Sequence, residues 1–515
     1  MMRKTFGAAL AAAALTATCS FGQVDRWLDQ PTGWSYLYSA TSAQIAALGA
    51  SQRVFNIERV GSNAYDVVAV TNSGSYQVSG MQIHYGQTAA SLGNLLESSN
   101  RRLIDLEPYA NGSVENFVAI TVPNTGATAA GWGWLYRATP QQIADWIGNA
   151  NPPLRLLDLD VYELNGQQYY SAVAVNNTGS NNQGWWYYFA RTAGEVTSLL
   201  TENQARLVDV EVHRQPGVGV PALYTVLMVA DNPGSGWWYP ALTQAEIGPL
   251  LEQNGARLTC IERYTNALNQ TRFAVAMVDN TTPETRRIRD AIRENIPSGD
   301  FGFKAKQVGG PTIASLNENF QFEPASMIKI LHAARAMRGV ELGNETLGSL
   351  VTLNVDTFGN SSCPVATTTT FPSLETTIRQ VMRNSSNEHT EALRRRYTTN
   401  GLMQFATTYG LAGTSLNHTI GCLCSEWPDF NTFTARDAVA LYEQLADGTI
   451  LDDFNKETLF DLMLNYPEHG DAVLTGIINQ EAASTNLTSA EILAFRNAVD
   501  AAWKGGSYNC TFSPN

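Results

Sequence analysis

The chain has 515 residues, of which 44% are hydrophobic, and its formal net charge at pH 7 is −14. A chain of this length is expected to form two or more domains, and this apolar fraction is enough to build a hydrophobic core in each. The acidic balance argues against nucleic acids and anionic membranes as partners, because both carry dense negative charge.

The first 22 residues are typical of a secretory signal peptide. Two basic residues precede an alanine-rich apolar run at 7–15, and Ser20 to Gly22 offers a cleavage site. We expect the mature chain to begin near Gln23 and to be exported, to the extracellular space or to a periplasm. No later apolar run is long enough to span a bilayer, so no membrane attachment is expected once the signal is removed.

Residues 23–280 contain five copies of a sequence repeat of about 51 residues. Each copy has an arginine followed by alternating apolar residues, as in Arg102-Leu103-Ile104-Asp105-Leu106, and the five arginines lie 49 to 53 residues apart: Arg53, Arg102, Arg155, Arg206 and Arg257. A period of this length is typical of stacked units that bury their faces against their neighbours.

Within each copy the sequence predicts the order β-α-β-β. An aromatic strand such as 185–189 comes first, and a helix with a threonine N-cap, such as the one that starts at Thr139-Pro140, follows it. The arginine strand is next, and a further strand such as 170–175 ends at an Asn-rich turn. We expect an α+β domain in which these units form an open or half-barrel-like array.

The repeated arginine and aspartate are expected to form hydrogen bonds between repeats rather than to act in catalysis. Cys260 stands where the pattern has aspartate, so the last copy is expected to be an atypical terminal unit. Nine of the eleven tryptophans precede residue 280. Alternation along the strands places about half of them in the core; the alternative is a platform for sugars or an extended peptide.

A second domain is expected at 281–515, beginning with a helix at 286–294 and a hairpin of 301–306 with 312–316. The motif Ser326-Met327-Ile328-Lys329 follows, in a chain that has only six lysines. Because residues i and i+3 share one face of a helix, the lysine amine can reach the serine hydroxyl. A neutral amine there can accept the serine proton and activate the nucleophile.

Two further motifs complete a set of three. Ser385-Ser386-Asn387 lies in the middle of the second domain, and Lys504-Gly505-Gly506-Ser507 lies near its end. In this order the motifs resemble the S-x-x-K, S-D-N and K-T-G boxes of class A β-lactamases and penicillin-binding proteins. The resemblance implies a β-lactamase/transpeptidase-like α/β domain that forms an acyl-enzyme on Ser326.

The resemblance also assigns roles to the polar residues. Ser326 would attack an acyl carbon, with Lys329 as base or proton relay. Ser385 would pass the proton to the leaving group, and Asn387 would hold a substrate amide and orient the lysine. Lys504 would keep the site positive and lower the pKa of Lys329 by like-charge repulsion.

The third box would bind the substrate through Gly505, Gly506 and Ser507. The backbone N–H groups of Ser326 and Ser507 would form the oxyanion hole. No metal motif competes with this interpretation, so neither a metal nor another cofactor is expected.

The boxes depart from the family pattern at three points. Ser386 replaces the usual aspartate, and Gly505 replaces a hydroxyl residue that binds the substrate carboxylate. No Glu-x-x-x-Asn signature lies between the second and third boxes; the nearest candidate, 426–431, has the wrong spacing. Since that glutamate drives deacylation in class A β-lactamases, its absence argues against efficient antibiotic hydrolysis and favours a peptidase or an esterase.

Tandem aromatic repeats joined to a β-lactamase-like domain resemble the polyglycine hydrolases. These are secreted serine endopeptidases that cut glycine-rich linkers, so the resemblance implies a glycine-rich protein or peptide as substrate. Two alternatives stay open: a penicillin-recognising D-Ala-D-Ala carboxypeptidase, β-lactamase or esterase, and a repeat-based binding protein with a degenerate hydrolase domain.

Two further expectations concern the C-terminus and the cysteines. Only nine residues follow the third-box glycines, whereas the β-lactamase fold continues with further strands and a helix, so we expect a domain that is C-terminally short. The mature chain has an odd number of cysteines, which predicts two disulfides and one remaining thiol in an exported protein: Cys260, Cys363, Cys422, Cys424 and Cys510.

Overall fold

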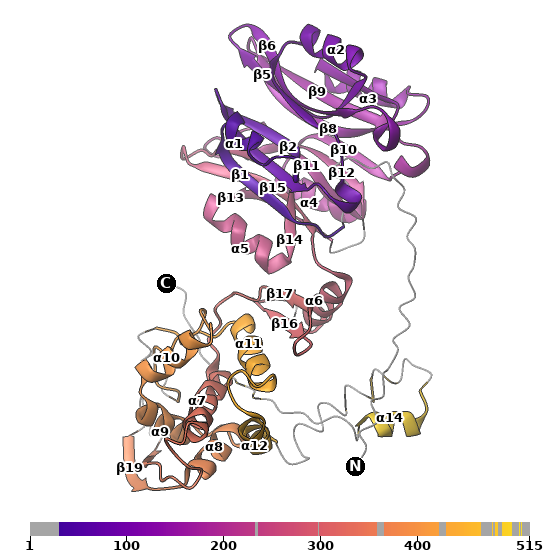
Figure 1. Ribbon diagram of the computed structural model, residues 1–515. Coiled ribbons are helices and arrows are strands. Elements are labelled where there is room, and N and C mark those ends of the chain that lie inside the picture. Colours follow the sequence, from indigo (N-terminus) through magenta and orange to yellow (C-terminus); the bar gives the residue numbers. More distant parts are fainter. Residues whose placement is uncertain are drawn as a thin grey trace. The chain divides into compact units, whose positions relative to one another are not determined.

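The computed structural model describes most of the chain between residues 30 and 506 (Figure 1), namely 30–231, 235–296, 298–357, 365–421, 429–464 and 487–496, with the single residues 476, 479, 480, 482, 504 and 506. The chain divides into two compact units, which meet between Thr282 and Pro283. Every helix in these segments is too short or too polar to span a lipid bilayer.

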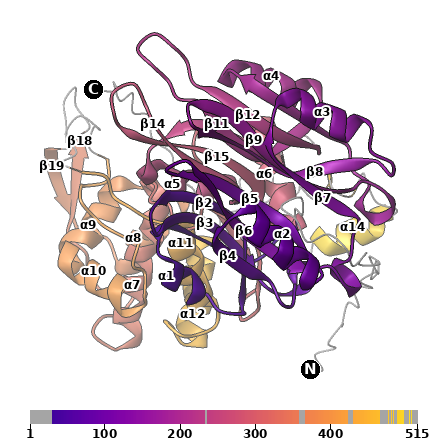
Figure 2. The ribbon, with the colours of Figure 1, turned by 90° about the horizontal axis from the view of Figure 1, so that it is seen from above.

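The first unit consists of five three-stranded antiparallel sheets, each with one helix, and Figure 2 shows it from above. The elements follow the predicted order β-α-β-β five times. The first three groups are β1 (Trp34–Ala40), α1 (Ser42–Ala46), β2 (Gln52–Gly61), β3 (Ala64–Thr71); β4 (Gln82–Gln87), α2 (Ala89–Ser98), β5 (Arg101–Asn111), β6 (Val114–Pro123); and β7 (Trp132–Ala138), α3 (Pro140–Gly148), β8 (Leu154–Leu164), β9 (Gln167–Asn176). The last two are β10 (Trp185–Arg191), α4 (Ala193–Glu202), β11 (Ala205–Arg214), β12 (Leu223–Ala230); and β13 (Gly236–Leu242), α5 (Gln244–Asn254), β14 (Ala256–Thr265), β15 (Thr271–Asp279).

The helices of the first unit begin where the sequence predicts them to begin. Each follows a threonine that forms a capping box with the third residue of the helix, and in α3 Pro140 occupies the first turn. The threonine oxygen and the returning side chain together satisfy backbone N–H groups that have no partner inside the helix. These starts were predictable because the signal is local.

The five sheets close into a ring. The arginine strands β2, β5, β8, β11 and β14 contact one another in sequence, and β14 also contacts β2 and β3. At this closure the Arg263 guanidinium pairs with both oxygens of Asp66 (2.6 and 2.7 Å), and Thr32 and Asn280 exchange two hydrogen bonds of 2.9 Å. The structure therefore differs from the open or half-barrel-like array that we expected, because a repeat period does not specify the rotation between neighbouring units.

The repeated aspartates join consecutive sheets, as predicted. The backbone N–H of Leu106 donates to Asp158 (2.7 Å), and that of Leu159 donates to Asp209 (3.2 Å). Asn56, at the equivalent position of the first group, accepts from Ile261 N across the closure (3.3 Å). Each unit thus ties a strand of the preceding unit to itself.

The repeated arginines and Cys260 form hydrogen bonds both within and between units. Arg102 and Arg155 donate from Nε to carbonyl oxygens in the turn that follows the middle strand of their own unit, at 2.8 and 3.1 Å. These two bonds lie within one unit, whereas the Arg257 guanidinium donates to the Tyr76 hydroxyl of the first repeat (2.9 Å), which is a bond between repeats as predicted. Cys260 is buried and donates its S–H to the Val210 carbonyl of the preceding unit (3.6 Å).

The aromatic strands are edge strands, and their rings are half-buried. The eight tryptophans described in the first unit all keep part of their surface exposed. Alternate rings stack along a strand, as in Trp34 with Tyr36 and Trp185 with Tyr187, each pair with ring centroids 5.5 Å apart. Each of these tryptophans is therefore partly buried and partly exposed to solvent, rather than a fully buried core residue or a fully exposed one.

The second unit has a helical core preceded by a helix and a hairpin. The prelude is α6 (Pro283–Asn295) with β16 (Phe303–Lys306) and β17 (Thr312–Leu316), close to the predicted bounds. Helix α7 (Lys329–Glu341) is buried along most of its length and packs against its helical neighbours. The other elements are β18 (Leu353–Thr357), β19 (Val365–Thr370), α8 (Leu374–Arg383), α9 (Asn387–Tyr397), α10 (Thr399–Thr408), α11 (Ala435–Ala446), α12 (Asp453–Met463) and α14 (Ser489–Arg496).

Some sequence-based expectations fall on residues outside the described ranges. These concern the signal peptide, four of the five mature cysteines and two residues of the third box: 1–22, Cys363, Cys422, Cys424, Cys510, Gly505 and Ser507.

Candidate active site

Ser326 lies in the short 3-10 turn Ala325–Ile328, immediately before α7. Ala325 has a φ of +46°, a left-handed backbone conformation that is uncommon for a residue with a side chain. Such strain is held in place by surrounding contacts and is often found at functional sites. One contact is the hydrogen bond from Ala325 N to the Glu323 carboxylate (3.1 Å).

The second box forms the turn between α8 and α9. Ser385 also has a positive φ of +53°. Ser386 is the N-cap of α9, where its Oγ accepts from His389 N (3.3 Å) and contacts His389 Nδ1 (2.8 Å). The serine that replaces the usual aspartate thus keeps a structural role, and Asn387 becomes the first residue of the helix.

The Lys329 amine is the centre of the site. It is the first residue of α7 and its side chain is fully buried. Its Nζ donates to the Ser385 carbonyl (2.5 Å), to Asn387 Oδ1 (2.6 Å) and to Ser385 Oγ (3.2 Å). Burial, and secondarily the charge of Lys504, lower the pKa of Lys329 to about 7.

Lys504 contacts the same serine, Ser385. Its Nζ donates to Ser385 Oγ (3.0 Å), so that one hydroxyl lies between two amines. Burial lowers the pKa of Lys504 to about 8. The expected like-charge effect on Lys329 is present, but burial is the larger cause of that shift.

Gly506 brings the third box against the nucleophile turn. A Cβ at this position would lie 2.7 Å from Ser326 N and from the Pro324 carbonyl, and 2.8 Å from Met327 N. Only glycine allows two backbones to approach this closely. Because Gly506 has no side chain, its backbone can pack directly against the Ser326 turn.

The structure thus brings Lys329, Ser385, Asn387 and Lys504 together through hydrogen bonds, and Gly506 beside Ser326. Among the described residues, no hydrogen bond joins the Ser326 hydroxyl to the Lys329 amine. Such bonds are often long or absent before substrate binds.

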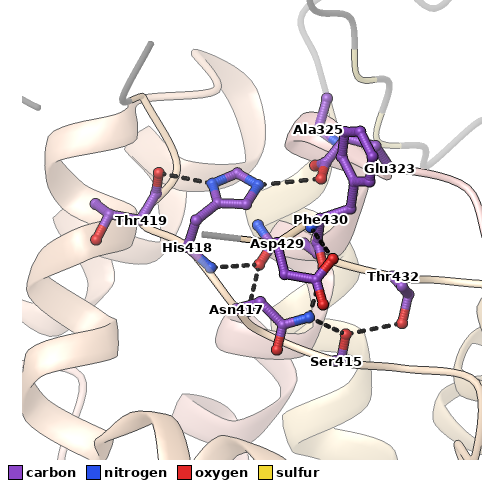
Figure 3. Close-up of polar contacts among 10 residues, drawn as sticks. Glu323, Ala325, Ser415, Asn417, His418, Thr419, Asp429, Phe430 and Thr432 are labelled. Atoms are coloured by element: carbon purple, nitrogen blue, oxygen red, sulfur yellow. Dashed lines mark hydrogen bonds and ion pairs between the residues drawn. The ribbon is translucent and has the colours of Figure 1, made fainter. Parts of the chain in front are cut away.

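A buried ion pair next to this turn was not anticipated from the sequence (Figure 3). His418 Nε2 lies 3.0 Å from Glu323 Oε2, and the two side chains are only 4% and 2% exposed. His418 Nδ1 lies 3.1 Å from the Thr419 carbonyl. Both ring nitrogens therefore lie within hydrogen-bonding distance of oxygen atoms.

The loop that carries His418 is fixed by the fully buried Asn431. Its Oδ1 accepts from the backbone N–H groups of Asn417 (2.7 Å) and His418 (3.0 Å). Glu323 then connects this loop to the nucleophile turn, through His418 on one oxygen and Ala325 on the other (Figure 3). No short sequence motif predicts the contact between Glu323 and His418, because the two residues lie 95 positions apart in the chain.

Comparison with known families agrees with this geometry. Residues 283–469 match the family model described as the beta-lactamase enzyme family. The second unit is a β-lactamase-like domain. The matched segment covers most of this unit and includes the first two boxes, but it ends before Lys504.

The solved structures that are similar to this chain include two β-lactamases and a protein named PBP-A. They are a β-lactamase from Chitinophaga pinensis DSM 2588 (19% identity, TM-score 0.31, 35% of this chain and 69% of that one), a class A β-lactamase representative from Bacteroides cellulosilyticus DSM 14838 (16%, 0.31, 36% and 69%) and PBP-A (20%, 0.29, 36% and 71%). Among curated proteins, nothing matches the chain.

Proposed function

We propose that the protein is a secreted serine endopeptidase that cleaves glycine-rich stretches of protein through an acyl-enzyme on Ser326. The observation that supports this most is the buried Lys329 amine, whose pKa is lowered to about 7 and which contacts both Ser385 and Asn387. An amine of this kind is a competent base near neutral pH.

The proposed acylation follows from these contacts. Neutral Lys329 accepts the proton of Ser326 as Oγ attacks the scissile carbonyl, and the backbone N–H of Ser326 faces the developing oxyanion. Ser385, which contacts both amines, relays a proton from Lys329 to the leaving amine as the C–N bond breaks. Lys329 is then neutral again and can take a proton from the water that hydrolyses the ester.

The glycine-rich substrate rests on the resemblance to polyglycine hydrolases. Gly505 has no hydroxyl for a substrate carboxylate, which favours cleavage within a chain over removal of a C-terminal residue. In this proposal the half-buried aromatic edge strands of the first unit hold the extended substrate. Stacked pairs such as Trp185 and Tyr187 offer flat apolar surface for that purpose.

The test is incubation of the secreted protein with a glycine-rich linker peptide, followed by mass spectrometry. We expect cuts between glycines that fall on the order of 10⁴-fold or more in rate for Ser326→Ala. Ser489→Ala, at an exposed serine on α14, is the matched control and keeps full activity. Intact peptide after long incubation with the wild-type protein would refute the endopeptidase proposal.

A second candidate function is that of a D-Ala-D-Ala carboxypeptidase, β-lactamase or esterase, which the β-lactamase-like domain favours. A chromogenic cephalosporin and a D-Ala-D-Ala peptide, run in parallel, distinguish the two. Turnover of either compound by the wild-type protein alone, without cuts between glycines, supports this alternative. The absence of turnover with all of these substrates supports a binding protein with a degenerate hydrolase domain.

A further inference from the structure

The ring of the first unit carries one acidic residue per repeat at the same position. Each lies on an arginine strand, five residues after the repeated arginine: Glu58, Glu107, Asp160, Glu211 and Glu262. Because these strands contact one another around the closed ring, the five side chains gather in one place. We call these five residues the carboxylate cluster.

The carboxylate oxygens lie at distances that suit a shared ion. Those of Glu58, Glu107 and Asp160 can all lie within 4.8 Å of one another, and Glu58 is also within this distance of Glu211. Glu58 therefore links the members into one group. Four of the five members line a cavity of about 340 Å³: Glu58, Glu107, Glu211 and Glu262.

Burial, together with repulsion between neighbouring carboxyls, raises the pKa of all five side chains, as expected where acidic groups gather without a compensating cation. In the described part of the chain, no ion pair reaches any of its five carboxylates. The two arginines that line the cavity are directed elsewhere: Arg263 pairs with Asp66, and the Arg59 guanidinium lies 4.0 Å from the centre of the Tyr109 ring.

One oxygen of the cluster lacks any partner. Glu211 is 4% exposed, and its Oε1 is fully buried and makes no hydrogen bond. Other members accept single bonds, such as Asp160 from Ser171 Oγ (3.0 Å) and Glu262 from Val212 N (3.4 Å). Since an unsatisfied buried acceptor costs free energy, Glu211 points to a ligand that the cavity is built to hold.

The chemistry of the donors selects the ligand. Ca²⁺ takes six to eight oxygen ligands in flexible geometry, and the carboxylates of Glu58, Glu107, Asp160 and Glu211 with waters in the cavity can supply them. Cys260 lies beside Glu58 and Glu211, but it donates its S–H to the Val210 carbonyl and is therefore a thiol rather than the thiolate that zinc prefers. We propose that the carboxylate cluster binds a Ca²⁺ ion at the centre of the ring.

This inference goes beyond the proposed hydrolase function and does not depend on it. The sequence predicted no metal, because ligands that lie about 50 residues apart form no recognisable metal motif. An ion held by Glu58, Glu107 and Asp160, with Glu211 beside Glu58, joins strands of several units, so that calcium binding and ring stability are linked.

The experiment uses the full mature chain, stripped with a chelator and dialysed. Calorimetric titration with CaCl₂ is expected to give one bound ion per chain, and the thermal midpoint is expected to rise with calcium concentration. Glu211→Gln removes one ligand and one buried negative charge. We expect this variant to lose the calcium-dependent rise while its midpoint in chelator stays equal to or above that of the wild type.

Glu163→Gln, at an exposed position of β8, is the matched control and retains the full rise. Equal midpoints of the wild-type protein in calcium and in chelator, without binding heat, overturn the proposal. A rise with Zn²⁺ but not with Ca²⁺, abolished by Cys260→Ser, also overturns it. A Glu211→Gln protein whose midpoint still rises with calcium removes Glu211 from the site and contradicts the assignment.

Discussion

Two lysines of lowered pKa share one serine hydroxyl at the candidate site. Burial lowers the pKa of Lys329 to about 7 and that of Lys504 to about 8, and both amines donate to Ser385 Oγ. In the proposed mechanism Lys329 acts when neutral, whereas Lys504 must be charged for the role that the family resemblance gives it, which is to keep the site positive. The fractions of these two active forms change in opposite directions as pH rises.

The dependence of kcat/KM on pH is therefore expected to be bell-shaped, with one limb near pH 7 and the other near pH 8. Below the first limb Lys329 is protonated and cannot accept a proton; above the second, Lys504 loses its charge. Lys504→Met is expected to move the limb of Lys329 to higher pH, because removal of a nearby positive charge raises the pKa of an amine.

Initial rates of peptide cleavage across both limbs measure this shift. Lys456→Met is the control, since Lys456 pairs with Asp453 on α12 and is expected to leave the profile unchanged. A rising limb that stays in place, or moves to lower pH, in Lys504→Met contradicts the assigned coupling between the two amines.

At the scale of elements, the ion pair of Glu323 and His418 joins two segments that lie far apart in the chain. Glu323 precedes the nucleophile turn, and His418 belongs to the loop after α10. The second oxygen of Glu323 holds Ala325, whose left-handed backbone sets the course of the turn into Ser326. The pair therefore positions the turn that carries Ser326.

Glu323→Ala is expected to destabilise the second unit by about 1–3 kcal/mol, because it leaves a buried ring nitrogen of His418 without its hydrogen-bond partner. His418→Ala is expected to cost a similar amount, and the double variant little more than either single one, since the two side chains interact directly. Urea unfolding of the full chain, with loss of peptide cleavage as the signal for the second unit, measures these free energies.

Glu375→Ala provides the comparison, because Glu375 forms an exposed pair with Arg379 and is expected to cost no more than about 1 kcal/mol. Additive costs of Glu323→Ala and His418→Ala in the double variant would show that the two residues stabilise the unit independently.

At the scale of the whole molecule, the sequence was sufficient where the signals are local. The order β-α-β-β follows from aromatic alternation, from caps such as Thr139 and from the arginine strands. The candidate site was predictable to the same extent, because Ser326, Lys329, Ser385 and Asn387 sit in short motifs whose spacing specifies a turn or a helix start.

Features that depend on long-range geometry were not predictable in this way. Asp66 and Arg263 meet across 197 residues, and Glu323 and His418 across 95. Closure of the ring depends on the rotation between neighbouring sheets. Side-chain packing determines this rotation, and the period of a sequence repeat does not predict it. The carboxylate cluster forms because the ring closes, so it could not be predicted from the sequence without knowledge of that closure.

Closure itself can be tested at the contact between the first and last sheets. The Asp66 side chain is fully buried, and burial raises the pKa of its carboxyl even though Ser39 N and the Arg263 guanidinium bind it. Arg263→Met keeps the apolar stem of the side chain but leaves a buried carboxylate without its cation. We expect a loss of about 3–5 kcal/mol in the free energy of unfolding of the first unit.

The measurement is urea unfolding followed by tryptophan fluorescence, since most tryptophans lie in the first unit. Arg214→Met removes an exposed arginine from the end of β11 and is expected to change stability by less than about 0.5 kcal/mol. Asp66→Asn combined with Arg263→Met removes both charges and is expected to recover part of the loss, because no unpaired charge stays buried. Equal stability of Arg263→Met and Arg214→Met would mean that the first and last sheets are held together without this ion pair, by the apolar residues that they share, such as Phe55 and Val275.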